Sequence, residues 1–144
     1  MKPIKVALLG IGTVGSGVFN VLRRNQAEIS ARVGRGIEIV LVADRNLAHA
    51  KSITGDAVEV IDDAFAAVSR PDIDVVVELI GGYTVAKELV LKAIENGKHV
   101  VTANKALLAV HGTEIFKATP QKGVMVAIEA AVAGGLTIIK ALHP

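Results

Sequence analysis

The sequence contains no cysteine and no tryptophan among its 144 residues, and aromatic residues make up 3% of it. Without cysteine, the chain has no disulfide, no thiolate ligand for a metal and no cysteine nucleophile. Hydrophobic residues nevertheless account for 51% of the chain, so the core must be built from aliphatic side chains. Such a composition favours buried parallel strands that are covered by amphipathic helices.

The chain also lacks a charge imbalance and a long apolar run. Its 16 basic and 14 acidic residues give a formal net charge of +2, without the basic clusters that nucleic acids or membrane surfaces attract. No apolar segment reaches the ~18 residues that span a bilayer, and no secretory signal is recognisable. We therefore expect one cytoplasmic domain with neither a nucleic acid nor a membrane as its partner.

What the chain does have is a glycine-rich motif, GIGTVG at positions 10–15, directly after the apolar segment 4–9. In a strand that leads into a helix, Gly10 would allow the tight turn, Gly12 would let the backbone approach a pyrophosphate, and Gly15 would let helix and strand pack closely. The first N–H groups of the helix would face the phosphates. The alternative is a turn with a structural role alone.

The remainder of the chain alternates short apolar segments with amphipathic ones, which is typical of an α/β protein. We expect a Rossmann-type, doubly wound, mostly parallel sheet of about six strands with helices on both faces. Strands are expected at 4–9, 37–43, 58–61, 74–79, 98–102 and 124–128. Helices are expected at 13–30, 47–53, 64–68 and 84–96, and a further one at 113–119, between Gly112 and Pro120. Asp63 and Asn104 are expected as helix caps.

An acidic residue closes the second expected strand. Asp44 stands where such folds bind the adenosine ribose through its hydroxyls, which favours NAD. The next residue, Arg45, offers a planar bidentate donor to the 2′-phosphate of NADP. The sequence leaves the choice between the two cofactors open, and Arg45 as a solvated loop residue remains an alternative.

Two further segments follow strand ends, where ligands bind in open α/β sheets. Ile80 and Gly81 could line the ribose and nicotinamide half of a pocket, or could simply form a turn. Lys105 is expected in the first turn of a helix, where the helix dipole disfavours a cation. Its ammonium could hold a substrate or cofactor group beside the nicotinamide, and a solvated lysine is the alternative.

Three motifs together resemble the amino-terminal domain of homoserine dehydrogenase, and the resemblance spans nearly the whole chain. They are GIGTVG at 10–15, TANK at 102–105 and EAAVAGG at 129–135. The resemblance implies NAD(P)-dependent interconversion of L-homoserine and L-aspartate 4-semialdehyde, a step of threonine and methionine biosynthesis. It also implies a small amino-acid substrate and a homodimeric parent enzyme.

Carried over residue by residue, the resemblance assigns Lys105 to positioning the substrate and the nicotinamide. It implies a sodium ion on oxygen ligands from Glu129, Val132, Gly134 and Leu136. The cofactor positions that it implies, together with those argued above, are Gly10, Ile11, Gly12, Thr13, Val14, Gly15, Asp44, Arg45, Ile80, Gly81 and Lys105.

Two departures from the family pattern qualify these expectations. Thr137 replaces the proline that usually stiffens the turn after the cation loop. The chain stops at Pro144, so we expect residues 1–130 to form the dinucleotide-binding domain and residues 131–144 to begin a connection to an absent substrate domain that carries the proton-shuttling residues. Such a chain should bind the cofactor but turn over little substrate.

Two alternatives compete with this interpretation. One is another oxidoreductase of the same architecture, of the sugar or inositol dehydrogenase type, although those tend to carry Glu-Lys-Pro after the fifth strand, where this chain has Asn104-Lys105-Ala106. The other is a non-catalytic dinucleotide-binding domain or an engineered structural domain.

Overall fold

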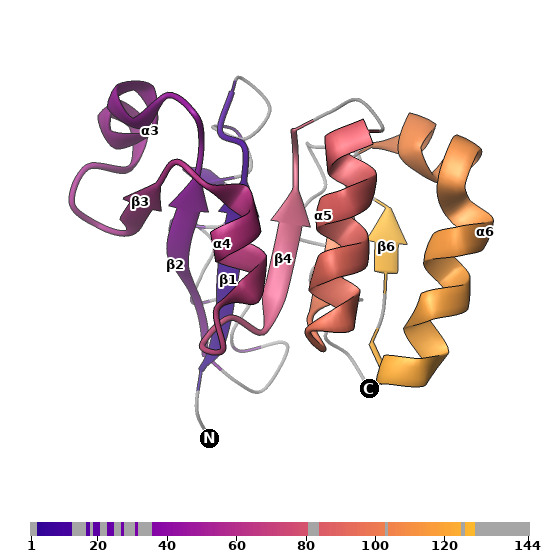
Figure 1. The fold of residues 1–144 in the computed structure, drawn as a ribbon. Coiled ribbons are helices and arrows are strands. Elements are labelled where there is room, and N and C mark those ends of the chain that lie inside the picture. The colour runs from indigo at the N-terminus through magenta and orange to yellow at the C-terminus, as the bar shows by residue number, and fades with distance from the viewer. Residues whose placement is uncertain are drawn as a thin grey trace.

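The computed structural model describes residues 3–12, 17, 19–20, 23–24, 27, 31, 36–80, 84–102, 104–124 and 126–128. Six parallel strands form one sheet in the order β3-β2-β1-β4-β5-β6 (Figure 1). The chain thus reverses its direction of winding between β1 and β4, which confirms the predicted doubly wound sheet. The strands are β1 Ile4–Leu9, β2 Ile37–Ala43, β3 Glu59–Ile61, β4 Val75–Glu78, β5 His99–Thr102 and β6 Val126–Ile128.

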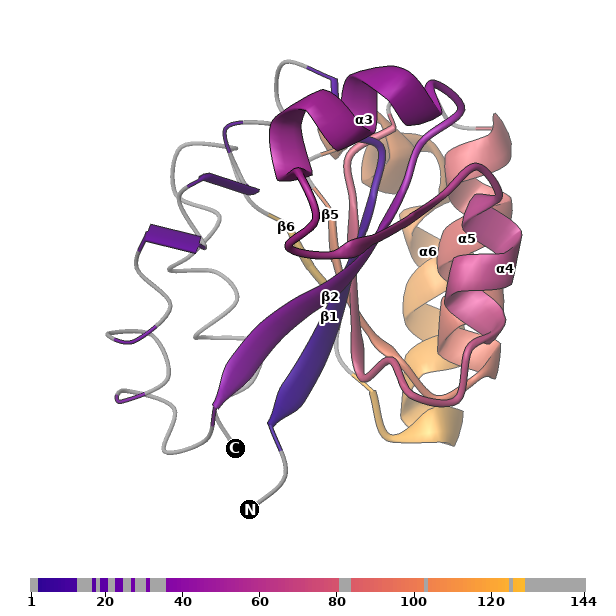
Figure 2. The same cartoon turned by 90° about the vertical axis from the view of Figure 1, so that its left-hand side faces the viewer.

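Three helices cover one face of this sheet. Figure 2 shows α4, α5 and α6 side by side on that face, with α3 near the carboxyl end of β2. Their buried side chains pack on the apolar residues of the sheet, including Leu9, Leu41 and Val76. The helices are α3 Leu47–Thr54, α4 Ala64–Ser69, α5 Thr84–Glu95 and α6 Lys105–Lys122.

The opposite face of the sheet has its own apolar core. Val6, Leu8 and Val77 point into it, and Phe19, which belongs to the described helical residues between 17 and 31, packs against them. Alternate residues of β1 therefore enter different cores, as the period of two in a strand requires. Helical residues lie on both faces, as predicted. None of the described helices is long and apolar enough to cross a membrane.

The predicted element boundaries agree with the structure to within two residues except in one helix, and the predicted ends of the helix at 13–30 lie outside the described residues. Four of the strands are one or two residues shorter than expected, and the caps are as predicted: Asp63 accepts from the Phe65 and Ala66 amides, and Asn104 from the Leu107 amide.

The prediction of a separate helix at 113–119 was wrong, because α6 runs through both Gly112 and Pro120 to Lys122. Pro120 lies in the last turn, where its missing N–H would have bonded the Phe116 carbonyl. The Thr119 hydroxyl donates to that carbonyl at 3.0 Å instead. The helix ends two residues later at Lys122, and Gly123 caps it with a left-handed φ of 64°.

The half-buried His99 side chain at the start of β5 makes stability depend on pH. Burial lowers the pKa of His99 below its usual 6.5, an effect that nearby Asp74 partly opposes. Below pH 6.5 the unfolded chain then binds a proton more readily than the folded chain, so stability falls as the pH falls through this range.

We predict that the free energy of unfolding in urea decreases from pH 7.5 to pH 5 with a histidine contribution of at most ~1.4 kcal/mol per pH unit. His99→Gln should flatten this part of the profile, because glutamine does not titrate. The matched control is His49→Gln, which changes an exposed histidine on α3. If the free energy of unfolding changes with pH equally steeply in wild type and in His99→Gln, the prediction is contradicted.

Candidate functional site

A cavity of about 630 Å³ opens at the carboxyl edge of the sheet, between the ends of β1, β2 and β4 and the beginnings of α4 and α5. This is the point at which the winding of the sheet reverses, where open α/β sheets bind their ligands. The residues that line the cavity come from loops and helix starts: Gly10, Gly12, Ala43, Asp44, Arg45, Asp62, Asp63, Ala64, Phe65, Leu79, Ile80, Thr84 and Val85.

The glycine-rich turn forms one wall of this cavity. Gly10 has a φ of 87°, and a Cβ at this position would lie 3.1 Å from Ile80 Cγ1 and 3.3 Å from the Ile80 backbone nitrogen. Gly12 is different, because a Cβ built on it meets no atom within 4 Å. Gly10 thus permits the close packing of two loops, whereas Gly12 borders open space, which is what close approach of a phosphate needs.

Asp44 joins the glycine-rich turn to the end of β2. Its Oδ2 accepts from the Ile11 amide at 2.8 Å, and its Oδ1 accepts from the Asn46 amide at 2.8 Å. The carboxylate is thereby held at the cavity wall. Arg45 beside it is exposed and lines the same cavity. The side chain of Ile11 is buried in the core.

Three apolar side chains also line the cavity, and of these only Ile80 was predicted as part of the site. Phe65, Ile80 and Val85 line the cavity and are 40%, 42% and 37% exposed. Phe65 and Val85 were not predicted to line it, because each falls at an apolar position of an amphipathic helix and periodicity does not distinguish the core from a ligand pocket. The two helices begin at this edge, so their first apolar residues border the cavity.

The structure brings together part of the predicted site. Gly10, Gly12, Asp44, Arg45 and Ile80 all line the cavity, whereas Lys105 is exposed at the first position of α6 and is not among the lining residues. The remaining predicted cofactor and cation positions lie outside the described residues: Thr13, Val14, Gly15, Gly81, Glu129, Val132, Gly134 and Leu136. Within the described residues, no group of three acidic or histidine side chains could hold a metal ion.

Two buried polar residues at this edge were also missed. Glu78 and Thr102 end β4 and β5, and Thr102 Oγ1 lies 2.6 Å from Glu78 Oε2. Glu78 Oε1 accepts the amide of Ile80. Each of the two polar residues lies near the end of an apolar strand that the sequence predicts. Two such residues at the ends of consecutive strands were the signal that could have revealed the pair.

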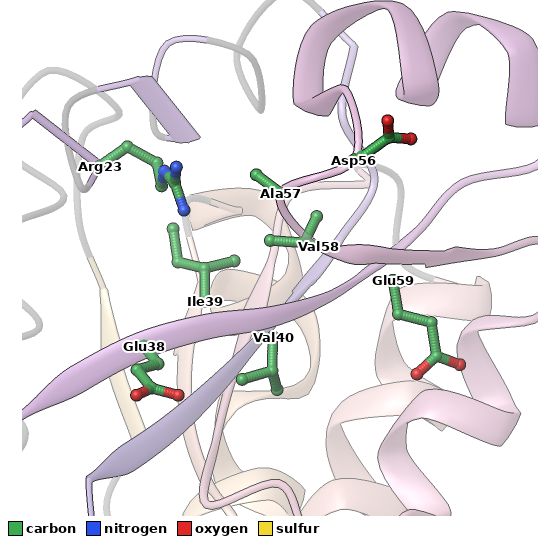
Figure 3. Close-up of a pocket in the computed structure, with 8 residues that line it drawn as sticks. All are labelled: Arg23, Glu38, Ile39, Val40, Asp56, Ala57, Val58 and Glu59. Carbon is green, nitrogen blue, oxygen red and sulfur yellow. The ribbon is translucent and has the colours of Figure 1, made fainter.

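A second cavity, of about 610 Å³, lies beside β2 and β3 but does not form a comparable site. Figure 3 shows that the guanidinium of Arg23 and the carboxylates of Glu38 and Glu59 lie on different sides of the β2 ribbon. The charged groups therefore do not converge on one ligand position. The cavity at the carboxyl edge is the candidate site.

The two described glycines of the motif should respond differently to the same substitution. Gly10→Ala should lower the free energy of unfolding by about 1–2 kcal/mol, because alanine is strained at a positive φ and its Cβ would press on Ile80. Gly12→Ala should change it by less than ~0.5 kcal/mol, because its surroundings are open. Chemical denaturation of both variants and wild type measures the difference, and equal losses would contradict the geometry described here.

Comparison with known proteins reveals close relatives. A family profile described as "Homoserine dehydrogenase, NAD binding domain" matches residues 10–129. A homoserine dehydrogenase of Pseudomonas aeruginosa is 63% identical over 143 residues, which are 99% of this chain and 32% of that protein. One from Methylobacillus glycogenes is 72% identical over 109 residues, or 76% of this chain and 26% of that protein.

Solved structures resemble the chain in the same way. A homoserine dehydrogenase from Thiobacillus denitrificans superimposes with a TM-score of 0.85 at 56% identity, covering 91% of this chain and 30% of that one. The enzyme from S. aureus gives a TM-score of 0.82 at 32% identity, covering 92% and 33% of the two chains. The chain thus spans about a third of the length of the relatives that it matches.

Proposed function

The chain belongs to the family of homoserine dehydrogenase NAD-binding domains, and we propose that it binds a nicotinamide adenine dinucleotide in the cavity at the carboxyl edge of its sheet. The family membership confirms the resemblance inferred from the three sequence motifs. The observation that carries the proposal is the cavity itself, which joins the open surface at Gly12 to the carboxylate of Asp44. These residues fit the phosphates and the adenosine ribose of a dinucleotide.

The two halves of the dinucleotide would contact different elements. The backbone at Gly10 and Gly12 would approach the pyrophosphate, and Asp44 and Arg45 would contact the adenosine ribose or its 2′-phosphate. Phe65 would offer its aromatic ring to the adenine, because aromatic rings stack favourably on one another. Ile80, at the end of β4, would border the nicotinamide half.

We further propose that the parent enzyme interconverts L-homoserine and L-aspartate 4-semialdehyde. The bound nicotinamide would supply hydride chemistry, and the protein would orient the reacting groups. Lys105 would hold a substrate oxygen at the carboxyl edge of β5. Because the chain spans about a third of its relatives, further functional groups of the reaction are expected outside it, and residues 1–130 alone would bind cofactor with little turnover.

Several finer expectations accompany this proposal. They are a role in threonine and methionine biosynthesis, a cytoplasmic location, a homodimeric parent and a sodium ion at Glu129, Val132, Gly134 and Leu136. These expectations come from the sequence motifs and remain predictions. The sugar or inositol dehydrogenase alternative has less support, because the matching family profile and the relatives at high identity are of homoserine dehydrogenases.

Calorimetric titration of the chain with NADH and NADPH tests the proposal. We expect at least one of them to bind, and Gly12→Ala to weaken that binding about tenfold or more, since its methyl group would occupy the space that the phosphates approach. The matched control is Gly112→Ala: Gly112 lies within α6, is not among the lining residues, and a Cβ built on it meets only the Phe116 ring, at 3.9 Å. A folded wild type that binds neither nucleotide at millimolar concentration would reject the proposal.

The choice of cofactor depends on two adjacent side chains with opposite charges. If Arg45 pairs with a 2′-phosphate, Arg45→Ala should weaken NADPH binding about tenfold while leaving NADH binding within about twofold. Lys51→Ala serves as the control for net charge, because Lys51 is an exposed cation on the nearby α3 that does not line the cavity. Equal losses for both nucleotides in Arg45→Ala would show that Arg45 does not discriminate between them.

A further inference from the structure

The last residue of β4 is an acidic side chain that is fully buried. Glu78 follows three valines, is 0% exposed, and is paired in the sheet with Thr102, the equally buried last residue of β5. Burying a carboxylate costs free energy unless hydrogen bonds compensate it. A fourth valine would continue this apolar strand without that cost, so the carboxylate must be explained by the contacts that it makes.

These contacts hold the backbone that follows both strands. Glu78 Oε1 accepts the amide of Ile80 at 3.0 Å, and Oε2 accepts the hydroxyl of Thr102 at 2.6 Å. The Thr102 oxygen in turn accepts the amide of Asn104 at 3.0 Å. One carboxylate, acting through one hydroxyl, therefore fixes where the chain goes after β4 and after β5.

Both fixed segments lead to groups that the proposed function places at the nicotinamide half. Ile80 lines the cavity, and its backbone packs against Gly10. Asn104 caps α6 by accepting from the Leu107 amide, which places Lys105 at the first position of that helix. The adenosine half is bordered by Asp44 and Arg45 after β2, which these hydrogen bonds do not reach.

We propose that Glu78 is a positioning residue for the nicotinamide half of the dinucleotide site, acting through the Ile80 amide and through Thr102. This inference rests on the proposed function. It follows that a break in this network selectively weakens recognition of the nicotinamide half. The adenosine half keeps its affinity, because Asp44 is held by other amides, those of Ile11 and Asn46.

Two variants of Thr102 and two ligands test the proposal in the full 144-residue chain. Thr102→Val keeps the shape of the side chain and removes its hydroxyl, whereas Thr102→Ser keeps the hydroxyl. NADH carries both halves of the cofactor, and ADP-ribose lacks the nicotinamide ring. Affinities are measured by calorimetry, and the fluorescence of the reduced nicotinamide reports the surroundings of its ring.

We expect Thr102→Val to weaken NADH binding about five- to tenfold and to leave ADP-ribose binding within about twofold. The fluorescence of bound NADH should also shift toward that of the free nucleotide. Thr102→Ser should restore the wild-type ratio of the two dissociation constants. An unchanged ratio in Thr102→Val, or a parallel loss for both ligands, would overturn the proposal.

Glu78→Gln provides an independent arm that tests the carboxylate itself. Its carbonyl oxygen can still accept from Ile80, and its NH₂ group can donate to Thr102 Oγ1, so the fold is retained while the direction of one hydrogen bond reverses. We expect a two- to fivefold loss confined to NADH. If circular dichroism shows that Thr102→Val does not fold, the ratio of the NADH and ADP-ribose dissociation constants in Glu78→Gln decides. A ratio equal to that of the wild type would then refute the inference. A wild type that binds neither ligand would instead reject the proposed function.

Discussion

The contact between Gly10 and Ile80 determines the shape of the candidate site. It brings the loop after β1 against the loop after β4, at the place where the winding of the sheet reverses. Each loop is then held from its far side, the first by the bond from the Ile11 amide to Asp44 and the second by the bond from the Ile80 amide to Glu78. Asp44 thereby ties the end of β2 to the turn after β1, Glu78 fixes the loop after β4, and the cavity lies at these three strand ends.

Local patterns predicted most of the fold because its strands are buried on both faces. A segment such as 37–43 is apolar over nearly its whole length, which left little choice of structure, and the observed β2 has these same limits. The doubly wound, mostly parallel sheet was predicted from the alternation of strands and helices together with the glycine-rich turn. The error in α6 arose because Gly112 and Pro120 break helices on average. The Thr119 hydroxyl and the position of Pro120 in the last turn offset that tendency. The average helix propensities of glycine and proline contain neither effect.

The parts of the site that were missed depend on contacts between residues far apart in the chain. Glu78 and Thr102 are 24 residues apart, and it is the pairing of β4 with β5 that makes them neighbours. Lys98, which does not line the cavity, is similar: its ammonium donates to the carbonyls of Arg70 and Ile73, a role that its position just before β5 does not reveal. Glycine and helix-cap signals are local and were found. Buried polar pairs need the register of the sheet before they can be recognised.

The two described glycines of the motif show why one residue type serves two opposite needs in this site. At Gly10 the missing side chain lets the loop after β1 pack directly against Ile80, which sets the position of that wall. At Gly12 the missing side chain leaves space unfilled, and a phosphate can approach the backbone there. A binding site for a charged, extended ligand requires both conditions within a few residues, since open space without a fixed wall would not orient the ligand. The spacing of the motif therefore reflects a division between structural and binding roles rather than a general demand for flexibility.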